Sequence, residues 1–125
     1  MKRLGNEFGK ALRRQRVMRG ETLGDTSDAI GVSAAMLSGI ELGRKAASEE
    51  LVGHLIEHFE LDGREATNFR DFARSSRKSI NLDMSNLPAD HRNTAAVFAR
   101  RFSELSGAEL RRIRSIMEPD VEEID

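Results

Sequence analysis

The side chains best suited to catalysis or metal binding are His54, Glu57 and His58. Their H-x-x-E-H spacing matches zinc peptidases in which two histidines on one helical face hold the metal. The apolar positions of the same stretch, which a helix would bury, are Leu51, Leu55, Ile56 and Phe59. The three polar residues then face solvent, and a zinc enzyme also needs a third protein ligand and an enclosed cleft. We therefore expect no enzymatic activity, no metal and no cofactor.

A second group of residues, from Thr22 to Arg44, has the spacing of two short helices joined by a tight turn. Gly31 stands where the backbone must reverse, and the apolar positions are Leu23, Ile30, Val32, Leu37 and Ile40. This spacing packs one helix across the other and leaves the second helix with a free outer face. A helix held in this way can enter the major groove of DNA, so the segment predicts contact with base pairs.

Residues 8–61 resemble the lambda repressor/Cro family, the XRE-type helix-turn-helix regulators. The matching motifs are RVMRGETL (16–23), AIGVS (29–33) and LSGIELGRK (37–45). Thr26 and Ser27 stand where the family usually has a larger apolar residue and Ala, which predicts a looser core with the same fold. The resemblance implies an all-α protein whose five-helix lambda-repressor-like DNA-binding domain occupies residues 1–63.

The resemblance also implies roles for single residues. Glu41 pairs with Arg16 of the first helix, a structural ion pair that fixes the recognition helix on its scaffold. The base-reading positions expected on the front of the third helix are Ser33, Ala34, Ala35, Ser38 and Gly39, the last permitting close approach to the backbone. The phosphate contacts expected around them are Thr22, Arg44, Lys45, Lys10, Arg13 and Arg14.

These base-reading positions lack the amide and guanidinium groups that make bidentate contacts with bases. Specificity then has two possible sources. The first combines serine hydrogen bonds, alanine contacts with thymine methyl groups and DNA shape. The second is base recognition by arginines outside the motif.

The 125-residue chain has 33% charged residues, 5% aromatic residues and no cysteine, a composition typical of a helical protein without disulfides. Residues 1–20 hold seven Lys/Arg and one Glu. Residues 21–62 hold two Lys/Arg and nine Asp/Glu, and residues 63–118 hold eleven Lys/Arg and seven Asp/Glu. A DNA-binding protein needs only a basic stripe, so a net charge of −1 is compatible with that function. With no secretion signal and no membrane-spanning run, we expect a cytoplasmic protein that does not bind membranes.

Capping residues and apolar periodicity predict the helices. The expected helices cover 6–18, with Leu4 on the inner face, then Thr22 to Ile30, 34–42, Ser48 through Phe59, 65–77, 88–105 and Ser106 to Met117. Thr22 with Asp25, and Ser106 with Glu109, have the spacing of capping boxes. The acidic tail after Pro119 is expected to fray.

The segment from Ile80 to Met84 alternates apolar and polar residues, which predicts one short β-strand. A lone strand needs a partner for its backbone groups. It would pair with the same strand of a second subunit or with a loop edge, and the alternative is an extended linker.

Residues 64–125 are expected to form a helical dimerisation extension. The apolar residues available for a homodimer interface are Phe69, Phe72, Ile80, Leu82, Met84, Phe98, Phe102, Leu110 and Ile113. Two half-sites read by a dimer would suit a palindromic operator, so we expect a dimeric repressor that binds double-stranded DNA.

Residues 86–118 also resemble the tail of XRE-type regulators encoded beside ImmA/IrrE-like metallopeptidases. That resemblance implies control by cleavage or by a protein partner. Two further alternatives are an antitoxin or regulatory partner that acts through residues 64–125, and a helical interaction module that no longer binds DNA.

Overall fold

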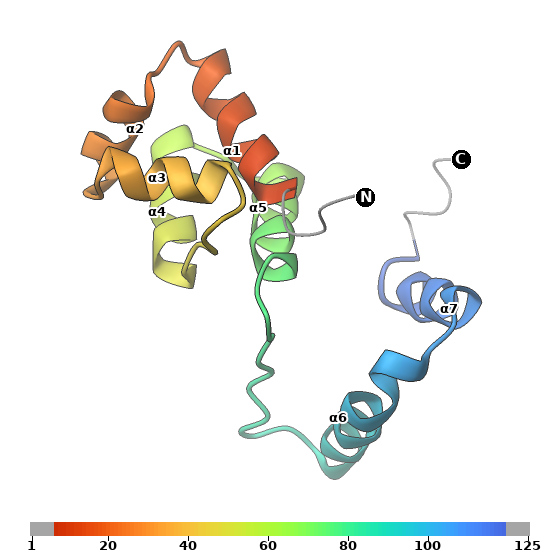
Figure 1. The fold of residues 1–125 in the computed structure, drawn as a ribbon. Coiled ribbons are helices and arrows are strands. Elements are labelled where there is room, and N and C mark those ends of the chain that lie inside the picture. Colours follow the sequence, from red (N-terminus) through yellow and green to blue (C-terminus); the bar gives the residue numbers. More distant parts are fainter. Residues whose placement is uncertain (1–6, 120–125) are drawn as a thin grey trace. The chain divides into compact units, whose positions relative to one another are not determined.

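The computed structural model describes residues 7–119, which form seven α-helices and one short 3-10 helix (Figure 1). The elements are α1 (Glu7–Met18), α2 (Leu23–Ile30), α3 (Ala34–Glu41), α4 (Glu49–Phe59), α5 (Gly63–Ser75), α6 (Ala89–Arg101), η1 (Phe102–Glu104) and α7 (Gly107–Met117). The expected contribution of Leu4, the helix start at Asn6 and the fraying tail lie outside the described residues. Among those described, no helix combines the length and apolarity needed to cross a bilayer.

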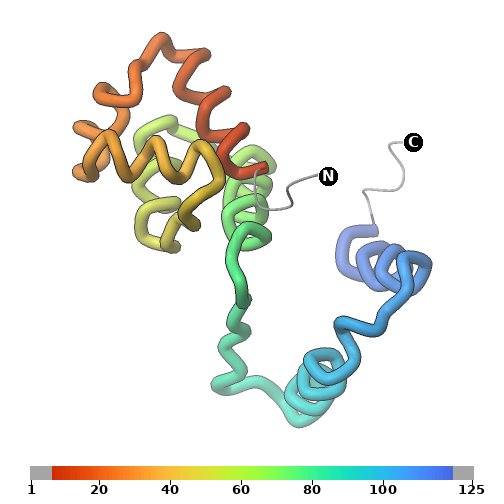
Figure 2. Tube along the Cα trace, in the orientation of Figure 1, coloured from red at the N-terminus to blue at the C-terminus, as the bar shows by residue number. Residues whose placement is uncertain are grey.

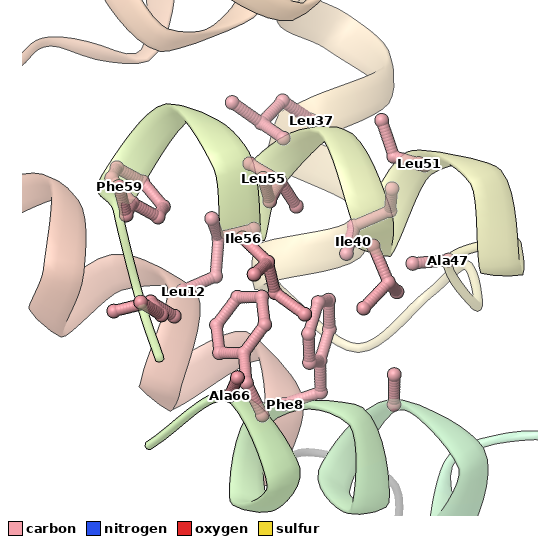
Figure 3. Close-up of a cluster of buried hydrophobic side chains, with 14 residues drawn as sticks. Phe8, Leu12, Leu37, Ile40, Ala47, Leu51, Leu55, Ile56, Phe59 and Ala66 are labelled. Carbon is pink, nitrogen blue, oxygen red and sulfur yellow. The ribbon is translucent and has the colours of Figure 1, made fainter. Parts of the chain in front are cut away.

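The chain divides into two compact units, Met1–Asn81 and Leu82–Asp125. In the first unit α3 packs on α1 and α2, while α4 packs on α2 and α5, and α5 also lies against α1. Figure 3 shows side chains from α1, α3, α4 and α5 gathered in one cluster. Its buried members are Phe8, Leu12, Leu37, Ile40, Ala47, Leu51, Val52, Leu55, Ile56, Phe59, Leu61, Ala66, Phe69 and Ala73.

Local signals in the sequence set the ends of the helices around this core. The predicted capping box at Thr22 is confirmed: its hydroxyl accepts from the Asp25 N–H at 3.0 Å, and its own N–H donates to the Asp25 carboxylate at 2.9 Å. Ser33 and Ser48 cap α3 and α4 through their hydroxyl groups alone, which accept from the N–H groups of Met36 and Leu51. Gly31 ends α2 with φ of 78°, a backbone conformation that favours glycine. These caps fix how α2 passes into α3.

The first unit extends to Asn81, whereas the sequence analysis placed the domain boundary at residue 63, where α5 begins. The reason is that α5 supplies Ala66, Phe69 and Ala73 to the core. Phe69 is 3% exposed and its ring lies 4.7 Å from that of Phe8. The expectation that Phe69 lies at a dimer interface is therefore wrong, because the side chain is enclosed within its own unit.

Thr26 and Ser27, the two departures from the family pattern, are buried polar residues with satisfied hydroxyl groups. The Thr26 hydroxyl donates to Glu21 at 2.6 Å, and the Ser27 hydroxyl donates to the Gly24 carbonyl at 3.1 Å. A buried hydroxyl costs little when it keeps a hydrogen bond. These residues thus replace apolar packing with specific polar contacts.

The second unit has a different character. Its described residues, 82–119, include no buried side chain. The confirmed capping box of Ser106 and Glu109 starts α7. Val97 and Phe98 of α6 and Phe102 of η1 are nevertheless exposed. Two short helices cannot enclose a core by themselves.

No strand is assigned anywhere in residues 7–119, and the predicted strand at Ile80–Met84 is absent from the single chain. Figure 2 shows this segment as part of the non-helical path between α5 and α6. Its end folds into a turn instead, because the Ser85 N–H donates to the Asp83 carboxylate at 3.0 Å and the Leu87 N–H to the Met84 carbonyl at 3.3 Å. Within one chain, the segment finds no neighbouring strand to pair with.

Candidate nucleic-acid interface

The N-terminal part of α3 lies on the surface of the first unit. Leu37 and Ile40 anchor the helix in the core, and the expected base-reading residues Ser33, Ala34 and Ala35 are exposed. Ser38 and Gly39 are half-buried. The side chains on this front are short, so the surface of a partner could approach the helix backbone closely.

The structure brings Arg16 of α1 and Glu41 of α3 together in a two-pronged ion pair, as the family resemblance implied. Arg16 Nε donates to Glu41 Oε2 at 2.7 Å, and Arg16 Nη2 to Glu41 Oε1 at 3.1 Å. The side chains are only 13% and 8% exposed. The hydrogen bonds to Glu41 raise the pKa of Arg16, which opposes the effect of burial. Two hydrogen bonds between charged groups set both the distance and the orientation of the two side chains, so the pair fixes α3 on α1.

Glu21 extends this contact into a network that sequence analysis missed. Arg16 Nη1 donates to the Glu21 carbonyl at 2.9 Å, which ties the ion pair to the loop before α2. The Glu21 carboxylate accepts from Thr26 and lies 2.9 Å from His58 Nε2 on α4. The hydrogen bond from Thr26, followed by the contact with His58, lowers the pKa of Glu21. The only sequence signal was a glutamate beside the Thr22 cap, with no indication of its distant partner.

The predicted phosphate-binding residues come from three parts of the first unit: α1, the start of α2 and the turn after α3. Arg44 and Lys45 lie in the turn after α3 and are exposed. Both donate their backbone N–H groups to the Gly39 carbonyl, at 2.8 and 3.2 Å. Thr22 is exposed at the start of α2, where backbone N–H groups and the helix dipole favour anions. Arg14 instead lines a groove beside Phe72 of α5.

Lys10 and Arg13 are also exposed on α1. They complete the set of basic residues that the sequence analysis assigned to phosphate, and their contact with DNA stays a prediction.

The H-x-x-E-H residues do not assemble a metal site. His54 and Glu57 are exposed, while His58 is held by Glu21. Within residues 7–119, no group of three or more His, Cys, Asp or Glu side chains is placed to hold a metal ion. His58 thus differs from the prediction that it lies on the open solvent side.

The residues expected at a dimer interface have diverse environments. Phe72 is 37% exposed on α5, and Ile80 and Leu82 are exposed in the segment that follows. The remaining candidates belong to the second unit. These are Phe98 and Phe102, which are exposed, and Met84, Leu110 and Ile113, which are half-buried.

A family model for a helix-turn-helix domain matches residues 7–69. The chain belongs to this family. The matched stretch begins with α1 and ends within α5, and it includes α3 and the Arg16–Glu41 pair. Membership in this family indicates a DNA-binding regulator. No curated protein and no solved structure matches the chain.

Proposed function

We propose that this helix-turn-helix protein is a sequence-specific regulator that binds double-stranded DNA, acting as a dimeric repressor on a palindromic operator. The observation that carries the proposal is the exposed front of α3, formed by Ser33, Ala34 and Ala35 and held in place by the ion pair of Arg16 and Glu41. A protruding helix with a fixed orientation is what insertion into the major groove requires. The relation to the lambda repressor/Cro-like XRE regulators belongs to the same proposal.

The small side chains of α3 suggest how bases are recognised. Ser33 and Ser38 offer hydroxyl groups to base edges, and Ala34 and Ala35 suit contacts with thymine methyl groups. Short side chains bring the helix close to the groove floor, so groove width and DNA deformability contribute to the choice of site. Arg44 and Lys45 then supply the phosphate contacts beside the helix.

The second unit supports the dimer. Its groove has an apolar part formed by Val97 and Phe98 of α6, Ile113 of α7 and Leu105 of the connection between them. The polar residues that also line it are Asn93, Thr94, Arg101 and Glu109. Residues 82–119 bury no side chain, so they gain stability when such a groove is covered. We propose that the second unit of another copy of the chain occupies this groove. The two-fold symmetry of the resulting dimer would match two operator half-sites.

Selection from a random-sequence duplex library with the purified protein tests the proposal. We expect a palindromic motif, to which Ala35→Glu no longer binds because the added carboxylate would face the groove. Asn68→Glu, an acidic change on the exposed side of α5, is the matched control and should bind normally. Unchanged operator binding by Ala35→Glu would contradict the assignment of α3.

The double variant Arg44→Ala, Lys45→Ala separates positioning from base recognition. It should weaken binding to selected and scrambled duplexes alike and reduce the salt dependence of the affinity by about two phosphate contacts. A loss confined to the selected duplex would instead assign base recognition to these residues.

A second candidate function is binding of another protein through residues 64–125, as an antitoxin or as the partner of a metallopeptidase. The absence of buried side chains in residues 82–119 favours it as well, because a foreign partner would also cover the groove. Light scattering on the full chain discriminates the two: a dimer at micromolar concentration supports the operator-binding repressor, and a monomer supports the second candidate.

A further inference from the structure

Gly39 lies in α3, in the half of the helix that follows the exposed front. A Cβ atom placed on this glycine would meet three carbons of one side chain, the Cδ, Cγ and Cε of Lys45, at 3.4, 3.5 and 3.7 Å. The aliphatic part of Lys45 therefore covers the space that a side chain at position 39 would occupy. The sequence analysis expected Gly39 to permit close approach to the backbone, but the space beside it is already filled by the Lys45 stem.

The turn after α3 explains how Lys45 returns to the helix. Gly43 adopts φ of 81°, which reverses the chain. The N–H groups of Arg44 and Lys45 then both donate to the Gly39 carbonyl. Because its backbone is bonded to residue 39, the lysine side chain folds back so that its Cγ, Cδ and Cε lie beside the same residue.

The loop is also held at its far end. Ala47 is 1% exposed, and its carbonyl accepts from Arg77 Nη2 at 2.8 Å and Arg77 Nε at 3.2 Å. Arg77 also donates to Glu49 at 3.1 Å, and this hydrogen bond lowers the pKa of Glu49. The segment that carries Lys45 is thus fixed at Gly39 on one side and by Arg77 on the other.

We infer that Gly39 is a positioning residue: its missing side chain forms the seat on which the Lys45 stem rests, so that the ammonium group is held beside α3 to bind a DNA phosphate. The inference rests on the proposed function. A lysine normally loses considerable side-chain entropy when it binds. Packing its stem on the helix removes part of that loss before DNA arrives and leaves the charged end in water.

The distances predict which substitutions the seat tolerates. An alanine Cβ at 3.4–3.7 Å from the lysine carbons would make ordinary van der Waals contact, so Gly39→Ala should keep the arrangement. It should also raise the melting temperature, because alanine is a better helix former than glycine. The branched side chain of Gly39→Leu would occupy the volume of the Lys45 stem and displace it.

The experiment compares affinities for two probes, a duplex selected by the wild-type protein from a random library and a scrambled duplex of equal length. We expect Lys45→Ala and Gly39→Leu each to weaken binding to both probes about tenfold. Each should also reduce the slope of log affinity against log salt concentration, the salt slope, by about one. The double variant should be no weaker than either single variant, because both remove the same contact. Gly39→Ala should stay within about twofold of wild type.

Gly53 provides the matched control. It lies within α4, and a Cβ there would meet no atom within 4 Å, so Gly53→Leu should leave affinity and salt slope unchanged. Melting curves verify that each variant folds, and Gly39→Met replaces Gly39→Leu should the latter lower the melting temperature. The inference would be overturned if the affinity losses of the two single variants multiplied in the double variant. It would also be overturned if Gly39→Ala lost as much affinity as Gly39→Leu.

A measurement without DNA separates this inference from the proposed function. Nuclear Overhauser contacts between the Gly39 Hα atoms and the Lys45 methylene groups should be present in the free wild-type protein and lost in Gly39→Leu. Their absence from the wild type overturns the seat itself. Their presence in a protein that binds no duplex overturns the proposed function, and with it the role of the seat in DNA binding.

Discussion

The two units use the same kind of element and differ in what their helices enclose. In the first unit, helices separated by short loops bury fourteen apolar side chains in one cluster (Figure 3). In the second, amphipathic helices of similar length bury none within residues 82–119. Helical propensity and good caps are common to both, so they do not account for the difference. A helix is stabilised mainly by what covers its apolar face. The first unit supplies that cover itself, whereas residues 82–119 do not.

The largest effect should come from cutting the chain at two positions around α5. A fragment that ends at Gly63 loses the buried side chains of Ala66, Phe69 and Ala73 and opens the core around Phe8. We expect this fragment to show no cooperative unfolding transition by circular dichroism. A fragment that ends at Asn81 keeps every core residue and should unfold at the temperature of the first transition of the full chain.

Cooperative unfolding of the shorter fragment would show that α5 packs on a domain that is already complete. That result would restore the boundary at residue 63 that the sequence suggested. Failure of the longer fragment to fold would show instead that the first unit depends on the second.

A matched pair of truncations sharpens the comparison. Leu37→Ala removes a fully enclosed side chain of α3 and should lower the free energy of unfolding by about 2–5 kcal/mol. Ile113→Ala removes a half-buried side chain of α7 and should leave the first-unit transition unchanged within about 0.5 kcal/mol. Urea titration followed by helical ellipticity measures both. Equal losses for the two variants would mean that the second unit also has a core.

Features that depend on neighbouring residues could be predicted from the sequence. The caps Thr22, Ser33 and Ser106 mark the starts of their helices, and each forms its bond with a residue three positions along the chain. The pattern of Leu37 and Ile40 also identified the inner side of α3, and with it the exposed front. Helix caps and apolar periodicity depend on residues that are close together in the sequence, so these helices could be predicted.

Contacts between distant residues could not be predicted in the same way. His58 meets Glu21 from 37 residues away, and Arg77 meets the Ala47 carbonyl from 30 residues away. Phe69 shows the same limit, since its pattern marks an apolar face but does not say which element covers it. The Arg16–Glu41 pair, 25 residues apart, was expected only because a family resemblance supplied the partner.

Breaking that pair tests how much of the first unit's order depends on one polar contact. Glu41→Ala leaves Arg16 with its charge largely buried, and should cost roughly 1–4 kcal/mol of stability. Glu41→Gln keeps the shape and one acceptor, so it should cost less. Chemical denaturation gives the free energies, and exchange rates of the α3 amides show where the loss falls. A variant as stable as the wild type, with unchanged exchange, would contradict the anchoring role.

The smallest expected effect concerns pH and again contrasts the two units. Glu21 and Glu109 both have a lowered pKa, Glu21 mainly through the hydrogen bond from Thr26 and Glu109 mainly through the backbone N–H of Ser106. A carboxylate with a lowered folded pKa stabilises the fold above its usual pKa of 4.5, and that stabilisation is lost as the pH falls through the folded value. Glu21 is half-buried and its carboxylate bridges α2 and α4, whereas Glu109 caps one exposed helix. Glu21→Gln should therefore lower the stability of the first unit at pH 5, with the difference from wild type narrowing by pH 3. Glu109→Gln should leave the first-unit transition the same at both pH values, as measured by thermal melts.

A stability difference between Glu21→Gln and wild type that widened on acidification would contradict this prediction. It would mean that the carboxylate is held in its protonated form, the opposite of what its contacts with Thr26 and His58 imply.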